Sequence, residues 1–221
     1  GELSALLLES QEIKDRQPLY NRRLRRLSQL YTIQLDEAEE GLLRPTIVEA
    51  RNADRARRMY GLFASQAKAR AALIEVGRAR ALCDYVMVTP SPLTGACMSR
   101  QLKRCKGLCT EDWSKLHHNT ALMDGLSELA LKVWPYEGPV ALLERQNPQD
   151  HLSPFTLFVV DNWCLLATHK GEGEPDVDDL ESLSETTLAL DRDIYRYLVN
   201  VIFKRNERVA IKPLQGHVLN I

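Results

Sequence analysis

Long apolar runs are missing from this sequence of 221 residues. No stretch approaches the roughly 18 apolar residues that a membrane-spanning helix needs, so we expect no membrane partner. The chain also lacks a phosphate-binding glycine loop, a serine nucleophile elbow and an HExxH helix. These absences argue against the commonest nucleotide, esterase and zinc-peptidase sites. No signal peptide precedes the first helical pattern, and the cytoplasm is therefore the expected location.

A net charge is nearly absent as well, because the chain contains 29 Lys and Arg and 30 Asp and Glu. The two signs are nevertheless separated along the chain. Residues 1–110 carry 19 basic and 12 acidic side chains, a balance of +7, whereas residues 111–221 carry 10 and 18, a balance of −8. A basic half is typical of a surface that binds a polyanion, since Arg and Lys contacts to phosphate supply much of the affinity for nucleic acid. A solvated, charge-rich surface explains the same balance almost as well.

Cysteine is scarce, yet four of the five cysteines lie within the 27 residues from 83 to 109. Their spacing is C-x13-C-x7-C-x3-C, formed by Cys83, Cys97, Cys105 and Cys109. Clustered thiolates are typical of a zinc ion or an iron–sulfur cluster. A disulfide framework is the alternative, but such frameworks belong to small secreted domains. The remaining Cys164 lies in a predicted strand and is interpreted as a small buried hydrophobic residue.

The spacing also bears on which metal these thiols bind. Structural zinc usually takes its ligands from two short knuckles, each of the form C-x2-4-C. Only Cys105 and Cys109 are that close in this sequence. The two wider gaps suit a cluster held in a loop, so the spacing modestly favours [4Fe-4S] and leaves zinc as the alternative.

Periodicity predicts an α+β fold. Apolar residues at helical spacing indicate helices, and alternating or β-branched runs indicate strands. We expect helices over residues 2–14, 64–82, 111–133 and 194–203, and strands over 31–35, 46–50, 140–144, 156–160, 163–168 and 208–214. The first two strands form a short hairpin, and the basic helix that follows leads into the cysteine-rich irregular segment. A small mixed α/β region closes the chain, and the predicted domains are residues 1–27, 28–135 and 136–221.

One carboxylate stands beside a basic loop near the start of the chain. Glu9 lies on the first predicted helix, and Asn21 follows it by twelve residues. An arginine cluster comes directly after, formed by Arg22, Arg23, Arg25 and Arg26. A carboxylate is an oxygen ligand for Mg²⁺ or Mn²⁺, and arginines hold a phosphodiester backbone, so together they suit metal-assisted DNA cleavage. Each residue taken alone is more often a solvated helix residue or a turn residue.

Further basic side chains lie near the cysteines. Lys68 and Arg70 are on the basic face of the predicted helix over residues 64–82. Four more lie between the last three cysteines, at Arg100, Lys103, Arg104 and Lys106. We interpret all six as candidates for binding DNA phosphates.

For two histidines and three aromatic residues, a structural role is favoured over a functional one. His117 and His118 are adjacent on a predicted helix, so they point about 100° apart and are interpreted as helix surface. Trp134, Tyr136 and Trp163 are able to stack on bases. Their strand-rich, apolar surroundings favour a place in the core instead.

Three blocks of sequence resemble one family of nucleases. ELSALLLESQEIKDRQPLYNRRLRR, at residues 2–26, resembles the end of the GIY-YIG nuclease domain of the UvrC/Cho excision-repair endonucleases, where a leucine-rich helix carries the catalytic glutamate. MYGLF at 59–63 is similar to a Tyr-Phe-Gly-Pro-Phe segment of that family, and CMSRQLKRCKGLC at 97–109 to its cysteine block. The tail, around FVVDNWCLLAT and LDRDIYRYLV, is similar to bacterial proteins in which a DnaQ-like exonuclease domain precedes a GIY-YIG domain. The resemblance covers residues 1–110 well and 111–214 more loosely.

The resemblance implies a metal-dependent DNA endonuclease of nucleotide excision repair. Glu9 falls on the family's metal-binding glutamate and Asn21 on its asparagine near the active site, with Mg²⁺ or Mn²⁺ as the cofactor. The four clustered cysteines fall on the residues that the family uses for a [4Fe-4S] cluster. The implied partners are DNA and either excision-repair proteins or a DnaQ-like exonuclease domain in the same parent chain. The implied location is the bacterial cytoplasm, in association with the nucleoid.

The sequence also departs from the family's pattern. It has no GIY or YIG strand and no catalytic arginine helix, and the UvrB-contacting helices and RNase H-like domain of full-length UvrC are not recognisable. We therefore expect a C-terminal portion of a parent nuclease, which does not cut DNA by itself. The alternative is a non-catalytic nucleic-acid- or protein-binding module stapled by a metal or cluster. A cytosolic redox sensor that switches through its cysteines is a third hypothesis.

Overall fold

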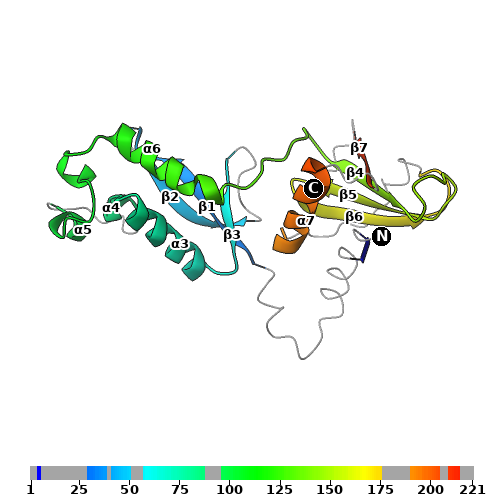
Figure 1. The fold of residues 1–221 in the computed structure, drawn as a ribbon, viewed down its shortest axis with the longest axis horizontal. Coiled ribbons are helices and arrows are strands. Elements are labelled where there is room, and N and C mark those ends of the chain that lie inside the picture. The colour runs from blue at the N-terminus through cyan, green and yellow to red at the C-terminus, as the bar shows by residue number, and fades with distance from the viewer. Residues whose placement is uncertain are drawn as a thin grey trace, which may run out of the picture. The chain divides into compact units, whose positions relative to one another are not determined.

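The computed structural model describes residues 4–5, 29–38, 41–50, 57–87, 96–175, 190–204 and 209–214 (Figure 1). The chain divides into two compact units, which we describe separately. The middle unit spans Gln29–Leu131, and the C-terminal unit contains the chain from Lys132 onward. Both contain helices and antiparallel strands, so the predicted α+β class is confirmed. Among the described residues, no helix has the length and apolar character needed to cross a membrane.

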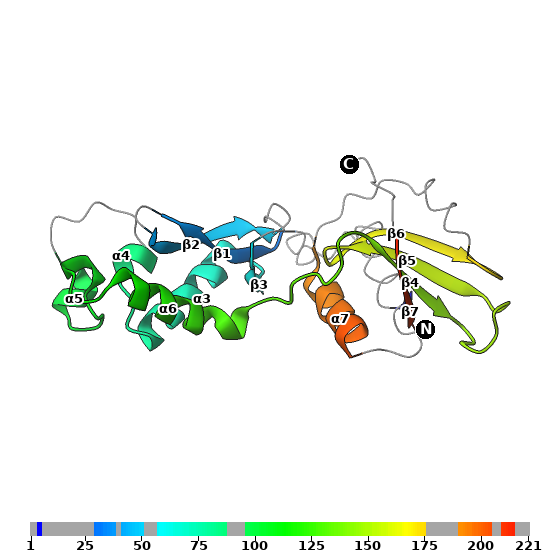
Figure 2. The same cartoon turned by 90° about the horizontal axis from the view of Figure 1, so that it is seen from above.

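A three-stranded antiparallel sheet forms one layer of the middle unit (Figure 2). It consists of β1 (Tyr31–Glu37), β2 (Leu43–Glu49) and β3 (Tyr60–Phe63), in the order β2-β1-β3. The predicted hairpin is confirmed, since β1 and β2 pair along their whole length. Periodicity does not predict β3, because four residues that include a glycine are too few to show an alternating pattern.

Two longer helices cover one face of this sheet. The first is α3 (Gln66–Ala79), which begins after Ser65, whose Oγ accepts a hydrogen bond from a backbone amide in the first turn. The second is α6 (Lys115–Leu126), capped in the same way by Ser114. This cap lies inside the predicted helix over residues 111–133, so the helix starts later than periodicity alone indicates.

Short elements connect these helices and complete the unit. They are α4 (Asp84–Met87), α5 (Met98–Gln101) and the single turns η4 (Leu108–Thr110) and η5 (Ser127–Leu129). The core between the sheet and the helices consists of apolar side chains, namely Ile33, Tyr60, Ala69, Leu73, Leu82, Met87, Leu122 and Leu126. A second, smaller core contains three of the cysteines and is described below.

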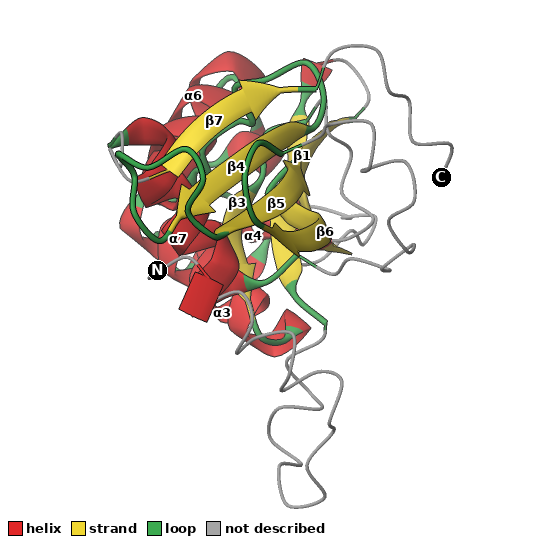
Figure 3. Ribbon diagram, turned by 90° about the vertical axis from the view of Figure 1, so that its right-hand side faces the viewer, coloured by secondary structure: helices red, strands yellow, loops and turns green. Residues whose placement is uncertain are grey.

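A four-stranded antiparallel sheet organises the C-terminal unit (Figure 3). Its strands are β4 (Val140–Arg145), β5 (Phe155–Asp161), β6 (Cys164–Gly171) and β7 (Val209–Pro213), in the order β6-β5-β4-β7. The four strands predicted in this region are confirmed, with small shifts at their ends. Cys164 is only partly buried, in contrast to its expected burial in the core.

The single described helix between β6 and β7, α7 (Arg192–Phe203), buries one apolar stripe formed by Ile194, Leu198 and Val201. Trp163 contacts this helix, with its ring 5.2 Å from that of Tyr195, and its indole nitrogen donates to the Lys132 carbonyl at 2.9 Å. The side chain is 1% exposed, which confirms its predicted place in the core. Trp134 and Tyr136 pack edge-on at 5.4 Å and are only half-buried.

The first predicted helix, over residues 2–14, is described only at Ser4 and Ala5, both of which are helical. The backbone nitrogen and Oγ of Ser4 both donate to Oε2 of Glu144, at 2.8 and 2.5 Å. Glu144 is a buried carboxylate in β4. These bonds tie Ser4 to the sheet of the C-terminal unit, while the rest of the predicted helix lies outside the described residues.

Candidate metal centre and basic surface

Three of the four clustered cysteines meet in one buried pocket of the middle unit. The Sγ atoms of Cys83, Cys97 and Cys105 all lie within 4.8 Å of one another. The Cys83–Cys97 separation is 3.7 Å and the Cys97–Cys105 separation is 3.9 Å, and all three are free thiols. Each side chain is at most 5% exposed. The structure therefore brings together residues that are up to 22 positions apart in the sequence.

The fourth cysteine, Cys109, lies at the edge of this group. It belongs to the turn η4, is only partly buried, and its Sγ accepts a hydrogen bond from the Cys97 backbone nitrogen at 3.4 Å. Its thiol is not within the 4.8 Å group. The sulfur atoms of three of the four candidate ligands thus lie close together. The fourth, Cys109, contacts the Cys97 backbone.

Local backbone geometry positions these thiols. The Cys83 carbonyl starts α4 by accepting from the amide of Val86 at 3.0 Å, and the Cys97 carbonyl starts α5 by accepting from the amide of Arg100 at 3.0 Å. Gly107 lies between the last two cysteines with φ of +86°, and a Cβ there would approach the Thr110 Oγ1 to 2.7 Å. A left-handed conformation favours glycine, and this close approach leaves little room for a side chain.

Burial and nearby hydrogen bonds shift the pKa values of the thiols. Burial raises the pKa of Cys83 to about 12 and also raises the pKa of Cys105. At Cys97 burial acts in the same direction, but the Arg100 amide and the neighbouring thiols outweigh it and lower the pKa. Since a metal binds the thiolate, an ion that enters this pocket must displace protons from the most buried sulfurs.

His118 lies directly behind the thiols. Its side chain is completely buried, so the interpretation as helix surface is wrong. The Nε2 atom accepts a hydrogen bond from the Cys83 backbone nitrogen at 3.3 Å, and burial lowers the pKa of the imidazole to about 4. The ring is therefore neutral near pH 7, with its proton on Nδ1. Within the described residues this Nδ1 has no hydrogen-bond partner.

Trp113 packs against His118 and Lys106 beside the cysteines. Its ring meets His118 edge-on, with the centroids 5.5 Å apart, and the ammonium group of Lys106 lies 4.6 Å from its centroid. The backbone amide of Lys106 also donates to the Ala81 carbonyl at 3.1 Å, which fixes the segment between two cysteines to the end of α3. His118 and Trp113 were missed as site residues because both belong to a region whose pattern indicates only an amphipathic helix.

The donor set fits a thiolate-bound metal centre. A tetrahedral zinc ion with Zn–S bonds of about 2.3 Å separates its sulfur ligands by about 3.8 Å. The observed sulfur–sulfur separations of 3.7 and 3.9 Å match this distance. A [4Fe-4S] cluster takes each thiolate on a different iron atom, so it needs the sulfurs farther apart. The present separations suit a single ion, and a cluster requires the thiols to turn outward.

Exposed basic residues surround the cysteine segment. Lys103, Arg104 and Lys106 all face solvent on the loop between α5 and η4. Arg100 instead forms an ion pair with Asp112, whose pKa is lowered by a hydrogen bond from Thr110 and by this guanidinium. Three of the four basic residues predicted here are thus available to an external anion.

Two apolar side chains stand among these cations. Met98 and Leu102 are 68% and 51% exposed, and Leu102 follows Met98 by one helical turn, so both lie on one side of α5. The remaining predicted basic residues of this unit, Lys68 and Arg70, are exposed on α3. Six candidates lie outside the described residues, namely Glu9, Asn21, Arg22, Arg23, Arg25 and Arg26.

Two family models match the chain. The UvrC/Cho excinuclease middle domain matches residues 30–128, and the excinuclease Cho C-terminal domain matches residues 139–218. The first range lies within the middle unit and the second within the C-terminal unit.

Curated proteins from several bacteria are similar over most of the chain. Excinuclease Cho of Shigella flexneri and excinuclease Cho of Escherichia coli K12 are each 33% identical over 214 residues, which make up 95% of this chain and 67% of the relative. UvrABC system protein C of Geobacter metallireducens is 32% identical over 139 residues, 60% of this chain and 22% of that protein. The chain thus spans about two thirds of the Cho relatives. No solved structure matches it.

Proposed function

Because this chain belongs to the UvrC/Cho excinuclease family, we propose that it is part of a metal-dependent endonuclease that incises DNA in nucleotide excision repair. The middle unit serves DNA binding and holds the cysteine segment in shape. The observation that carries this proposal is the group of three buried thiols beside the exposed Lys103, Arg104 and Lys106. Buried thiols at one focus suit a structural metal, and the cations next to them suit a phosphate backbone.

The metal centre is a [4Fe-4S] cluster held by Cys83, Cys97, Cys105 and Cys109, with a single zinc ion as the alternative. The likeness to the family supports the cluster, whereas the sulfur separations support the single ion. Absorbance and elemental analysis of anaerobically purified protein distinguish them. A brown protein with about four iron atoms per chain indicates the cluster, and a colourless protein with one zinc indicates the ion.

The reaction is hydrolysis of a phosphodiester bond, assisted by Mg²⁺ or Mn²⁺. Glu9 supplies a metal ligand and Asn21 lies near the reacting phosphate, both proposed from the family likeness alone. In a parent protein with measurable incision, Glu9→Gln should reduce the rate by orders of magnitude while DNA binding persists. Unchanged incision by that variant rules out Glu9 as the metal ligand.

DNA binding is the part of this proposal that the 221-residue chain tests by itself. Fluorescence anisotropy with a labelled duplex should show binding that weakens steeply with salt. Reversing Arg22, Arg23, Arg25 and Arg26 to glutamate should weaken it further. If the affinity for DNA is unchanged by these substitutions and by salt, the chain has no electrostatic DNA surface. The other proposed partners are excision-repair proteins or a DnaQ-like exonuclease domain, and the proposed location is the bacterial cytoplasm.

A second candidate function is a non-catalytic module stapled by the metal. It is favoured by the way Cys83, Cys97 and Cys105 form a small core with Leu42 and Val86, where the thiols act as packing residues. An intact parent protein that binds DNA but never incises it would favour this second function.

A further inference from the structure

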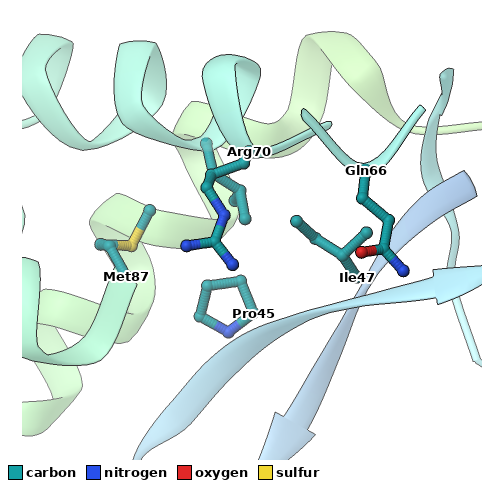
Figure 4. Close-up of a pocket in the computed structure, with 6 residues that line it drawn as sticks. Pro45, Ile47, Gln66, Arg70 and Met87 are labelled. Carbon is teal, nitrogen blue, oxygen red and sulfur yellow. The ribbon is translucent and has the colours of Figure 1, made fainter. Parts of the chain in front are cut away.

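A pocket of about 200 Å³ lies between β2 and α3 in the middle unit (Figure 4). It is lined by Pro45, Ile47, Gln66, Arg70, Leu73 and Met87. Two of these residues come from β2, three from α3 and one from α4. None of them is a cysteine, and no residue of the pocket has been assigned a role in the metal centre.

The inner part of the pocket is apolar and firmly held. Leu73 is 2% exposed and Met87 is 5% exposed, and both belong to the main core of the unit. Pro45 and Ile47 line the strand side, where the side chains of β2 are half-buried. These apolar side chains are able to pack against the flat face of a ring, but they form no hydrogen bond with it.

The polar groups of the pocket come from α3. Figure 4 shows the Arg70 side chain extending from the helix toward Pro45, and the Gln66 amide beside Ile47. Within the described residues, neither Arg70 nor Gln66 has a side-chain hydrogen bond or an ion pair with the protein. A guanidinium with five donors and an amide with donors and an acceptor therefore face the pocket without a protein partner.

The charge on α3 favours an anionic ligand. Lys68 and Arg78 are also exposed on this helix, and no ion pair within the described residues neutralises either of them. Lys68, two residues from Arg70, lies on the side of the helix away from the pocket. Arg80 differs, because it pairs with Asp124 at 2.8 Å. A strand of nucleic acid matches this surface, since its phosphates meet the cations while its bases meet the apolar side chains of the pocket.

The size of the pocket limits what enters it. Pockets that enclose a drug-sized ligand measure roughly 300–1,000 Å³, so about 200 Å³ admits one ring system and not a whole nucleotide. We propose that the pocket holds one nucleobase turned out of the stack of bound DNA, with Arg70 and Gln66 hydrogen-bonding its edge. This inference rests on the proposed DNA-binding function.

Fluorescence of 2-aminopurine tests the inference with the whole chain. Placed at single positions of a duplex oligonucleotide, this base brightens when it leaves the stack. Saturating protein should raise the fluorescence at one position. Arg70→Ala should make this step about tenfold weaker, because a charged donor is removed. Gln66→Trp, which fills the pocket from its exposed rim without touching the core, should abolish the rise.

Arg78→Ala is the matched control, since it removes the same charge from the same helix outside the pocket. It should weaken overall DNA affinity and leave the fluorescence rise at saturation intact. If Arg70→Ala and Arg78→Ala have the same effect on that rise, the pocket holds no base. A flat signal from the unmodified chain on bound DNA also overturns the inference and points to a protein side chain as the ligand. Failure of every form to bind DNA overturns the proposed function itself.

Discussion

The middle unit and the C-terminal unit differ in the composition of their cores. The middle unit covers a three-stranded sheet with helices and then adds a second, small core whose members are largely thiols. The C-terminal unit has a four-stranded sheet with an apolar core and a buried tryptophan against one helix. We infer that the first depends on a metal and that the second does not.

The difference also separates two kinds of buried polar group. In the middle unit, His118 is neutral, lacks a partner for Nδ1 within the described residues, and holds a backbone amide of a candidate ligand. In the C-terminal unit, the buried Glu144 accepts two hydrogen bonds from Ser4. The first arrangement positions the backbone of a candidate metal ligand, whereas the second fastens one segment to a sheet.

The largest expected effect comes from removing two thiols. Cys97→Ser combined with Cys105→Ser should unfold the middle unit at 37 °C, because either proposed metal centre loses two ligands. For the zinc alternative, the lost contribution is an apparent 10–16 kcal/mol or so, and a domain has about 5–15 kcal/mol of stability in total. Calorimetry should show its transition disappear while that of the C-terminal unit remains. Cys164→Ser, in β6, is the control and should keep both transitions. Equal behaviour of the two variants would mean that the clustered thiols hold no structural metal.

A smaller loss is expected from the core of the other unit. Trp163→Ala should reduce the free energy of unfolding of the C-terminal unit by about 3–5 kcal/mol, because it leaves a large cavity at a fully buried site. Added or removed metal should not change that loss. Denaturant titration followed by far-UV circular dichroism measures it, with Trp134→Ala at the half-buried neighbour as a milder comparison. If the loss of unfolding free energy depends on metal, the C-terminal unit is not independent of metal as we infer.

Acid should weaken the middle unit through His118. The pKa of this imidazole is lowered from an ordinary 6.5 to about 4 by burial, so the unfolded chain binds a proton more readily than the folded one. Its contribution is complete above pH 6.5 and is lost as the pH falls toward 4. The difference between the two pKa values corresponds to about 3 kcal/mol. Urea unfolding at pH 7.5 and pH 5 measures this, and His118→Gln should flatten the dependence. An equally steep dependence in that variant assigns the effect to other groups.

The smallest expected effect concerns the exposed cations. Lys103→Glu with Arg104→Glu should leave both thermal transitions in place, because both side chains face solvent. It should weaken DNA binding and lower the salt slope by about one for each phosphate that the protein no longer binds. Lys212→Glu, exposed on β7, is the matched change in the other unit and should alter the slope less. Equal slopes for the two variants would place the DNA surface elsewhere.

Much of this architecture was predictable from the sequence, and the exceptions have physical causes. The four cysteines were identifiable because thiols are rare and their clustering is a compositional signal that survives any fold. Three strands of the C-terminal unit, β4, β5 and β6, were identifiable because each begins as a short, largely apolar run between turn-forming residues. The short β3 was not, since its pairing with β1 depends on contacts distant in sequence.

The site around the thiols was only half predictable. His118 looks like one of two neighbouring surface histidines, and its burial follows from the packing of α6 against the chain at Cys83, which no local pattern encodes. The pocket beneath Arg70 is likewise formed by three elements and has no sequence signal. The roles of Glu9 and Asn21 stay predictions, because both lie outside the described residues.

Native-state hydrogen exchange before and after metal removal shows whether the middle unit depends on a bound metal. A chelator under reducing conditions should abolish protection in α4, α5 and the cysteine segment, and then across the middle unit. Protection of β4, β5 and α7 should not change. Exchange that is the same with and without metal throughout the middle unit, or a loss of protection shared equally by both units, would contradict this dependence.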